Sequence, residues 1–168
     1  GKVTGVDFSS AAITRAKRLS EDLDIPAHFV CCEIRERPSL FGEQFDFVFT
    51  SHGVLGWLPN LEVWAHSIAT CLRPGGTFYL ADTHPLAWAF AEENAIQESH
   101  LRLKEPYLSQ ADGSLYVESG SYADPYRPTK ANKTREWAWD FGHILNALIG
   151  GALGPDYWQN EADHIIDV

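Results

Sequence analysis

Residues 2–10 read Lys2-Val3-Thr4-Gly5-Val6-Asp7-Phe8-Ser9-Ser10, and this stretch decides the fold. Its apolar, β-branched beginning predicts a short strand that ends at Asp7. Ser9 and Ser10 are good helix N-caps, so a helix is expected from about Ala11. A strand that passes through an acidic residue into a capped helix is typical of an open α/β sheet, in which ligands lie beyond the carboxyl ends of the strands.

The residues that follow complete a strand–helix–strand unit. The helix is expected to extend to about Leu23, because Pro26 prevents its continuation. Ala27–Cys32 predicts a second strand, and two strands joined by one helix are parallel. The apolar residues of the helix recur at helical spacing, and its expected buried face consists of Ala12, Ile13, Ala16, Leu19 and Leu23.

Strands and helices continue to alternate as far as about residue 84. A strand is expected at 45–50, a helix after the N-cap Asn60, and a strand at 77–82, with Arg73-Pro74-Gly75-Gly76 ending the helix. The expected buried stripe of that helix is Leu61, Trp64, Ala65, Ile68, Ala69 and Leu72. This order predicts an α/β fold with a Rossmann-like, doubly wound, mostly parallel sheet that helices cover on both faces.

Beyond residue 84 the elements are shorter. We expect a helix at 86–95, strands at 115–122 and 136–139, and a helix at 143–153. No second domain is predicted, so residues 1–168 form a single domain with an insertion at about 84–135 on the substrate side.

Composition and charge narrow the function classes. Apolar residues make up 45% of the chain, enough for a real core. The net charge of −10 argues against nucleic-acid and anionic-membrane partners, and no apolar run is long enough to span a bilayer. The three cysteines, Cys31, Cys32 and Cys71, have no zinc-type spacing; buried, reduced thiols in a cytoplasmic protein are expected, and no metal site.

Several residues lie where a ligand would be bound. Asp7 can accept two hydrogen bonds from a ribose diol, or it can serve the helix that follows as an N-terminal acid. His52 and His84 each follow a predicted strand and are candidate bases, although such histidines also bond to their own loops. Trp57 and Trp88 either line an apolar pocket or pack beneath the insertion.

Three stretches together resemble class I S-adenosylmethionine-dependent methyltransferases from their second strand onward. They are Val3-Thr4-Gly5-Val6-Asp7-Phe8-Ser9, the run from Phe45-Asp46-Phe47-Val48-Phe49-Thr50 to Leu55, and Leu72-Arg73-Pro74-Gly75-Gly76-Thr77-Phe78-Tyr79-Leu80. The resemblance covers about residues 2–84. It implies methyl transfer from S-adenosylmethionine to a small molecule.

The resemblance also implies roles by position. The acid matching Asp7 holds the ribose hydroxyls, with Phe8 beside the adenosine. Glu33 and Ile34 match residues near the adenine, and Ser51, His52 and Gly53 match the turn close to the methionine part of the cofactor. The implied cofactor-binding set is thus Asp7, Phe8, Glu33, Ile34, Ser51, His52 and Gly53.

The family's first strand and Gly-rich loop have no counterpart in this sequence. That strand would lie between the strands containing Asp7 and Phe47. The chain also contains no methionine, so we expect a fragment that by itself binds the cofactor poorly. Two alternatives stay open, a catalytically silent methyltransferase-like binding domain and a nicotinamide-dependent dehydrogenase, since an acid after the second strand holds that ribose too.

Overall fold

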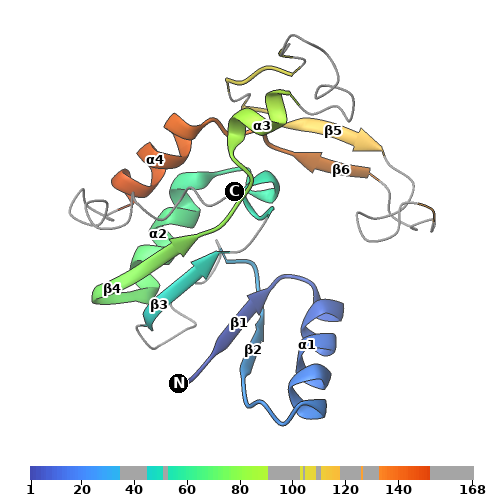
Figure 1. The fold of residues 1–168 in the computed structure, drawn as a ribbon, viewed down its shortest axis with the longest axis vertical. Helices are drawn as coiled ribbons and strands as arrows, with labels where there is room; N and C mark the ends of the chain where they lie inside the picture. Colours follow the sequence, from blue (N-terminus) through green and yellow to red (C-terminus); the bar gives the residue numbers. More distant parts are fainter. Residues whose placement is uncertain are drawn as a thin grey trace.

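The computed structural model describes residues 1–34, 45–50, 53–90, 103, 105–108, 111–117, 126 and 133–151. The first unit consists of β1 (Thr4–Asp7), α1 (Ser10–Asp22) and β2 (His28–Cys31). The strands are parallel, with Thr4 opposite His28 and Asp7 opposite Cys31. The predicted strand–helix–strand unit is therefore confirmed, and Figure 1 shows α1 packed beside β2.

A second unit contains β3 (Phe45–Thr50), the short 3₁₀ helix η2 (Leu55–Trp57), α2 (Leu61–Cys71) and β4 (Leu72–Leu80). β3 and β4 are also parallel, and a register shift lies between Phe45 and Phe47. β4 begins at Leu72 rather than at residue 77, so the Arg73-Pro74-Gly75-Gly76 turn belongs to an irregular start of the strand. Gly75 has φ 76°, a conformation that favours glycine.

The remaining elements are α3 (Pro85–Ala89), the antiparallel pair β5 (Ser114–Val117) and β6 (Lys133–Glu136), and α4 (Phe141–Gly150). α3 ends before the predicted residue 95; residues 91–95, 118–122 and 152–153 of the predicted elements lie outside the described residues. The strand expected at 136–139 is wrong, because Trp137 N–H donates to Gly56 O instead of continuing the hairpin. α4 begins two residues earlier than predicted, after its N-cap Asp140.

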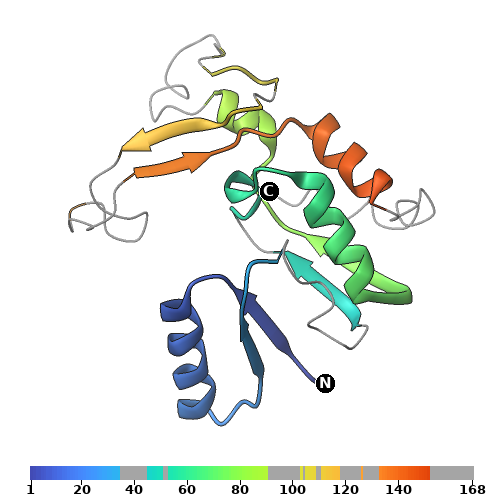
Figure 2. The same cartoon turned by 180° about the vertical axis from the view of Figure 1, so that it is seen from behind.

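The main core lies in the second unit. α2 covers one face of the β3–β4 pair and α4 packs beside α2, as Figure 2 shows from behind. The predicted stripe of α2 is buried apart from Ala69, which is partly buried. Core residues shared by α2 and α4 include Trp64 (2% exposed) and Leu148 (1%).

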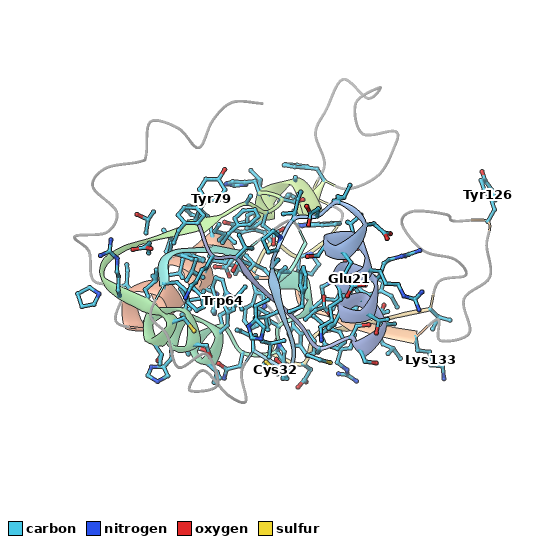
Figure 3. The ribbon with its side chains drawn as sticks, turned by 90° about the horizontal axis from the view of Figure 1, so that it is seen from below. Glu21, Cys32, Trp64, Tyr79, Tyr126 and Lys133 are labelled. Carbon is cyan, nitrogen blue, oxygen red and sulfur yellow. The ribbon has the colours of Figure 1, made fainter. Side chains whose placement is uncertain are left out.

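The opposite face of this strand pair carries aromatic residues. Phe78 points towards α2 and meets the ring of Trp64 at 5.8 Å, whereas Tyr79 points the other way (Figure 3). Tyr79 lies 5.4 Å from the ring of Phe49, and both side chains are about half exposed. One face of β3–β4 is therefore packed and the other is open in the described part of the chain.

α1 buries less of its apolar face than predicted. Ile13 is buried, but Leu19 and Leu23 are each 57% exposed. A shallow groove along this helix is lined by Ala11, Ala12, Arg15, Ala16 and Leu19. The sequence pattern identified the apolar side of α1 correctly, but the described residues supply little to cover it.

The two parallel pairs are not hydrogen-bonded to each other. β1 pairs with β2, β3 pairs with β4, and no described strand lies between β1 and β3. Ile34, just after β2, packs against the core of the second unit and thereby connects the two. The pairs share the parallel α/β organisation predicted from the sequence.

Candidate functional site

Asp7 stands at the junction between β1 and α1. Its Oδ1 accepts a 2.7 Å hydrogen bond from Ser9 N–H, while Ser9 Oγ accepts from Ala12 N–H at 3.2 Å. Ser9 is thus the helix cap, and Asp7 braces the turn before it. The residue is exposed, so its carboxylate can still accept bonds from a ligand.

Phe8 adds an apolar surface beside this carboxylate. It is 72% exposed, and its backbone oxygen accepts a 3.6 Å contact from Cys31 Sγ. Cys32 N–H donates to Asp7 O at 3.1 Å, which fixes the end of β2 against the end of β1. An exposed ring next to an acid suits a ligand with a planar base and a sugar diol.

The two predicted residues after β2 are partly covered by the rest of the protein. Glu33 and Ile34 are both half-buried, and the Ile34 side chain contacts the core of the second unit. Ile34 therefore has a packing role whatever its backbone binds. The three cysteines are thiols rather than disulfides, as expected, but Cys31 is exposed and only Cys71 is buried, so the expectation of three buried thiols is wrong.

Asp82, which the sequence did not single out, organises the turn after β3. Its Oδ1 accepts from Gly53 N–H at 3.0 Å and its Oδ2 from Leu55 N–H at 3.2 Å. Oδ1 also accepts from Thr83 N–H at 2.7 Å. This carboxylate joins the carboxyl ends of β3 and β4, and Gly53 has φ 75° in the turn that it holds. Ser51 and His52 lie outside the described residues.

His84 follows β4 and caps α3. Its Nδ1 accepts a 3.2 Å hydrogen bond from Leu86 N–H, and its ring stacks on Phe141 with the centroids 5.6 Å apart. The bond to the loop is the simpler of the two roles considered for this residue. His84 also stands at the strand end where a ligand of this fold would lie.

The aromatic residues near this edge have different surroundings. Trp57 and Trp88 are 52% and 55% exposed, so neither is packed away. Trp139 Nε1–H donates to Leu58 O at 2.8 Å and fixes the residue that follows η2. Indoles exposed to this degree are accessible to a ligand.

The predicted residues fall into two groups at the carboxyl ends of the parallel strands. Asp7, Phe8 and Glu33 follow β1 and β2, whereas Gly53 and His84 follow β3 and β4. No group of three or more metal-ligating side chains occurs within the described residues. Among the described helices, none is long and apolar enough to cross a membrane.

Parallel strand pairs with an acid at a strand end are typical of Rossmann-like α/β proteins. Residues 1–80 match the family model of a methyltransferase domain. This match confirms the resemblance to class I methyltransferases for residues 1–80. None of the curated proteins matches significantly.

Solved structures show the same fold. An S-adenosylmethionine-dependent methyltransferase from Clostridium acetobutylicum ATCC 824 is 12% identical, with a TM-score of 0.59 over 90% of this chain and 63% of that one. A protein from Pyrococcus horikoshii OT3 is 18% identical, with a TM-score of 0.55 over 88% and 60%. The glycopeptide N-methyltransferase MtfA, complexed with S-adenosylmethionine, is 18% identical, with a TM-score of 0.53 over 89% and 65%. The chain thus spans less than two thirds of the length of these proteins.

Proposed function

We propose that this chain is part of an S-adenosylmethionine-dependent methyltransferase that acts on a small molecule. The observation that carries the proposal is the Asp7 carboxylate, exposed at the end of β1 beside the open ring of Phe8, within the segment that matches a methyltransferase domain. A similar protein, MtfA, was solved with S-adenosylmethionine and with sinefungin, which supports the choice of cofactor.

The residues present fit the nucleoside part of that cofactor. Asp7 would accept the ribose hydroxyls and Phe8 would contact the adenine, with Glu33 and the backbone of Ile34 near its ring edge. Ser51, His52 and Gly53 would approach the methionine part, and Asp82 would hold that turn through the Gly53 and Leu55 N–H groups. When bound, the cofactor supplies an electrophilic methyl group, so the protein must align the acceptor and exclude water.

The acceptor would bind between the turn after β3 and the segment 84–135. Trp57 and Trp88 would supply apolar walls, since both indoles are half exposed. His52 and His84 are the candidate bases proposed from the sequence. For His84, the bond from Leu86 N–H to Nδ1 favours a hydrogen-bond donor at Nε2.

The decisive experiment measures cofactor binding by calorimetry with Asp7→Ala in the full-length protein. Losing charge-assisted bonds of about 1.5–3 kcal/mol each should weaken S-adenosylmethionine binding at least tenfold. Asp22→Ala, at the exposed far end of α1, is the matched control and should bind normally. Unchanged affinity in Asp7→Ala would contradict the proposed site.

Two further measurements separate the alternatives. Competition between S-adenosylmethionine and a nicotinamide dinucleotide distinguishes the methyltransferase from a dehydrogenase. Tight cofactor binding without transfer of labelled methyl to any of a panel of small acceptors would favour a silent binding domain.

A further inference from the structure

Asp82 lies at the edge where β3 and β4 stop pairing. The ladder of these strands continues one residue past β4, because Ala81 N–H donates to Thr50 O at 3.0 Å. Asp82 comes next in the chain and is half-buried, whereas Gly53, in the turn after β3, is exposed. The carboxylate of Asp82 thus stands where ligands bind in open α/β sheets, beyond the carboxyl ends of the strands.

The two oxygens of this carboxylate bind backbone groups from different parts of the chain. Oδ2 accepts from Leu55 N–H at 3.2 Å. Oδ1 accepts from Gly53 N–H at 3.0 Å and from Thr83 N–H at 2.7 Å. Gly53 and Leu55 belong to the turn after β3, whereas Thr83 begins the segment after β4. Because Gly53 and Thr83 share one oxygen, the turn and the start of that segment are fixed relative to each other.

The backbone of the turn after β3 is shaped to bind an anion. Gly53 has φ 75°, in the left-handed region, and Val54 has φ −72° and ψ −38°, in the right-handed helical region. Successive residues of these two kinds direct their N–H groups towards one side, where they form an anion-binding concavity. Asp82 supplies the anion from within the chain, so the turn is held in the conformation that leads into the buried Leu55.

The segment after β4 is also held at a second point. His84 follows Thr83, accepts from Leu86 N–H through Nδ1 at 3.2 Å, and stacks on Phe141 with the ring centroids 5.6 Å apart. The backbone oxygen of His84 accepts from Ala87 N–H at 2.8 Å, which closes the first turn of α3. The start of α3 is therefore held by the Asp82 carboxylate on one side and by the Phe141 ring on the other.

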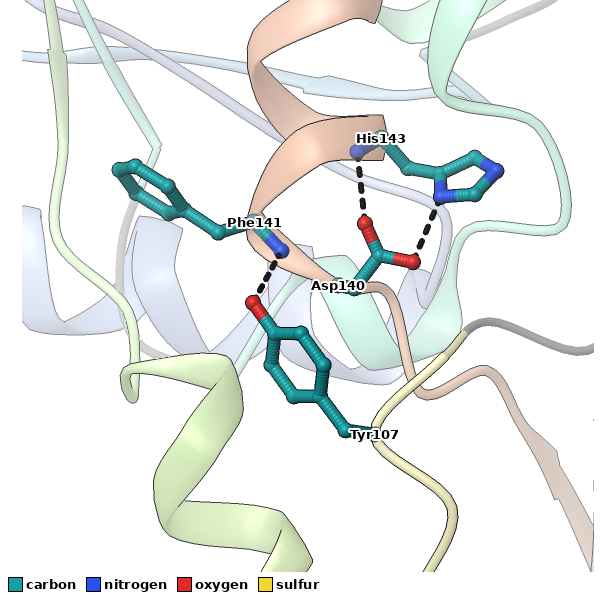
Figure 4. A network of polar contacts seen from close by, with 4 residues as sticks. All are labelled: Tyr107, Asp140, Phe141 and His143. Atoms are coloured by element: carbon teal, nitrogen blue, oxygen red, sulfur yellow. Dashed lines mark hydrogen bonds and ion pairs between the residues drawn. The ribbon is translucent and has the colours of Figure 1, made fainter.

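The support at Phe141 belongs to the first turn of α4. Phe141 N–H donates a long 3.4 Å bond to Tyr107 OH, as Figure 4 shows. Asp140 caps the same turn, because its Oδ1 accepts from His143 N–H at 2.9 Å, and its Oδ2 lies 2.7 Å from Nδ1 of the His143 ring. Since α4 packs against α2 in the main core, the core fixes the position of Phe141 and of the ring stacked on it.

We propose that Asp82 is a positioning residue that fixes the turn at the methionine end of the cofactor relative to the segment that carries His84 and Trp88. The inference rests on the proposed function. Trp57 lies in η2, directly after the bound turn, and Trp88 lies in α3, so the carboxylate joins the two backbone segments that carry the proposed acceptor walls. Such a joint aligns acceptor and cofactor, and a misplacement of about 1 Å can cost about 10²-fold in rate.

The joint is tested first without ligand, in the full-length protein. Asp82→Ala removes both acceptor oxygens, so solvent exchange of the Gly53, Leu55 and Thr83 amides, measured by NMR, should become at least about fivefold faster. Asp82→Asn retains one acceptor oxygen and should have an intermediate effect. Asp22→Ala, at the exposed far end of α1, is the matched control and should leave these rates unchanged. Unchanged exchange in Asp82→Ala would overturn the proposal.

Two ligands then separate positioning from a general loss of structure. S-adenosylhomocysteine and 5′-methylthioadenosine share the nucleoside and the thioether sulfur, but only the first carries the amino-acid part of the cofactor. Asp82→Ala should weaken S-adenosylhomocysteine binding at least about fivefold in calorimetry, because a smaller fraction of the protein holds the turn in the binding conformation. Methylthioadenosine, bound through Asp7 and Phe8, should keep its affinity in ligand-observed NMR. Similar losses for both ligands, or for neither, would contradict the proposal.

The same titrations report whether the segment after β4 responds to the cofactor. In the native protein, S-adenosylhomocysteine should shift the amide signals of Phe8, Thr83 and Leu86, since Leu86 N–H is bonded to the His84 ring. In Asp82→Ala saturated with this ligand, the Phe8 signal should still shift, whereas the responses of Thr83 and Leu86 should be largely lost. Responses of Thr83 and Leu86 that are absent in the native protein, or complete in the variant, would overturn the proposal.

Failure of this inference and failure of the proposed function give different results. If the native protein binds neither ligand, or if Asp7→Ala binds both normally, the proposed function fails, and the exchange rates alone then decide whether Asp82 joins the two segments. If Asp7→Ala weakens both ligands and Asp82→Ala changes neither, only the positioning role is contradicted.

Discussion

The two parallel units share a topology but differ in what holds them together. The unit of β3, β4, α2 and α4 encloses Trp64, Leu148 and neighbouring buried side chains, whereas α1 buries one residue, Ile13. Both units have capped helices and parallel strands, so capping and strand direction do not explain the difference. The free energy of folding depends on how much apolar surface the helices and strands bury against one another. A helix that packs on a single strand pair buries little of its apolar face and is therefore less stable.

The largest expected effect on stability comes from comparing a buried leucine of one unit with an exposed leucine of the other. Leu148→Ala in α4 should lower the free energy of unfolding by about 2–5 kcal/mol, because it empties a fully buried site. Leu19→Ala on the exposed side of α1 should cost less than about 1 kcal/mol. Urea denaturation measures both, and similar losses would show that α1 is better packed than its exposure indicates.

Hydrogen exchange should separate the units next. Amides of 10–22 should open at a lower free energy than those of 61–71, with exchange at least about tenfold faster, equivalent to about 1.4 kcal/mol. Peptide-level mass spectrometry in native buffer tests this. Equal protection of both helices would mean that the chain unfolds as one cooperative unit.

Helix caps provide a smaller, matched comparison. Ser9 accepts from Ala12 N–H and Asn60 accepts from Val63 N–H, so each cap contributes about 1 kcal/mol to its helix. Asn60→Ala should lower the global free energy of unfolding by that amount. Ser9→Ala should mainly increase exchange within α1. A global loss from Ser9→Ala as large as that from Asn60→Ala would contradict the separation.

The smallest expected effect is on the pH dependence of the free energy of unfolding, through Cys71. Burial raises the pKa of the Cys71 thiol above its ordinary value of 9.0, and the neighbouring Cys32 adds to this. The unfolded thiol ionises first, so the free energy of unfolding should be unaffected below about pH 9 and fall above it. Urea titrations at pH 8 and pH 10 should show a smaller pH-dependent loss in Cys71→Ala than in the native chain. An identical loss would show that Cys71 does not contribute.

Several features of the site followed from local sequence. The strand ending at Asp7, a cap at Ser9 or Ser10 and the buried stripe of α2 were predicted because each depends on residues within a turn or two of one another. Asp82 was missed, since the Leu55 and Gly53 N–H groups that it holds lie 27 and 29 residues away. The Asp140–His143 pair had a readable signal, an acid at a helix start three residues before a histidine, but the helix was predicted to begin too late.

The sequence by itself determined the parallel α/β organisation, the acid at the end of β1 and the apolar sides of α1 and α2, because periodicity and capping are local properties. The tertiary structure decided how much of each apolar side is covered and which distant backbone groups Asp82 holds. Burial and hydrogen bonds of this kind depend on partners brought in from elsewhere in the chain. For this reason α1 and α2 both carry an apolar stripe, but Leu19 of α1 is 57% exposed whereas Trp64 of α2 is 2% exposed.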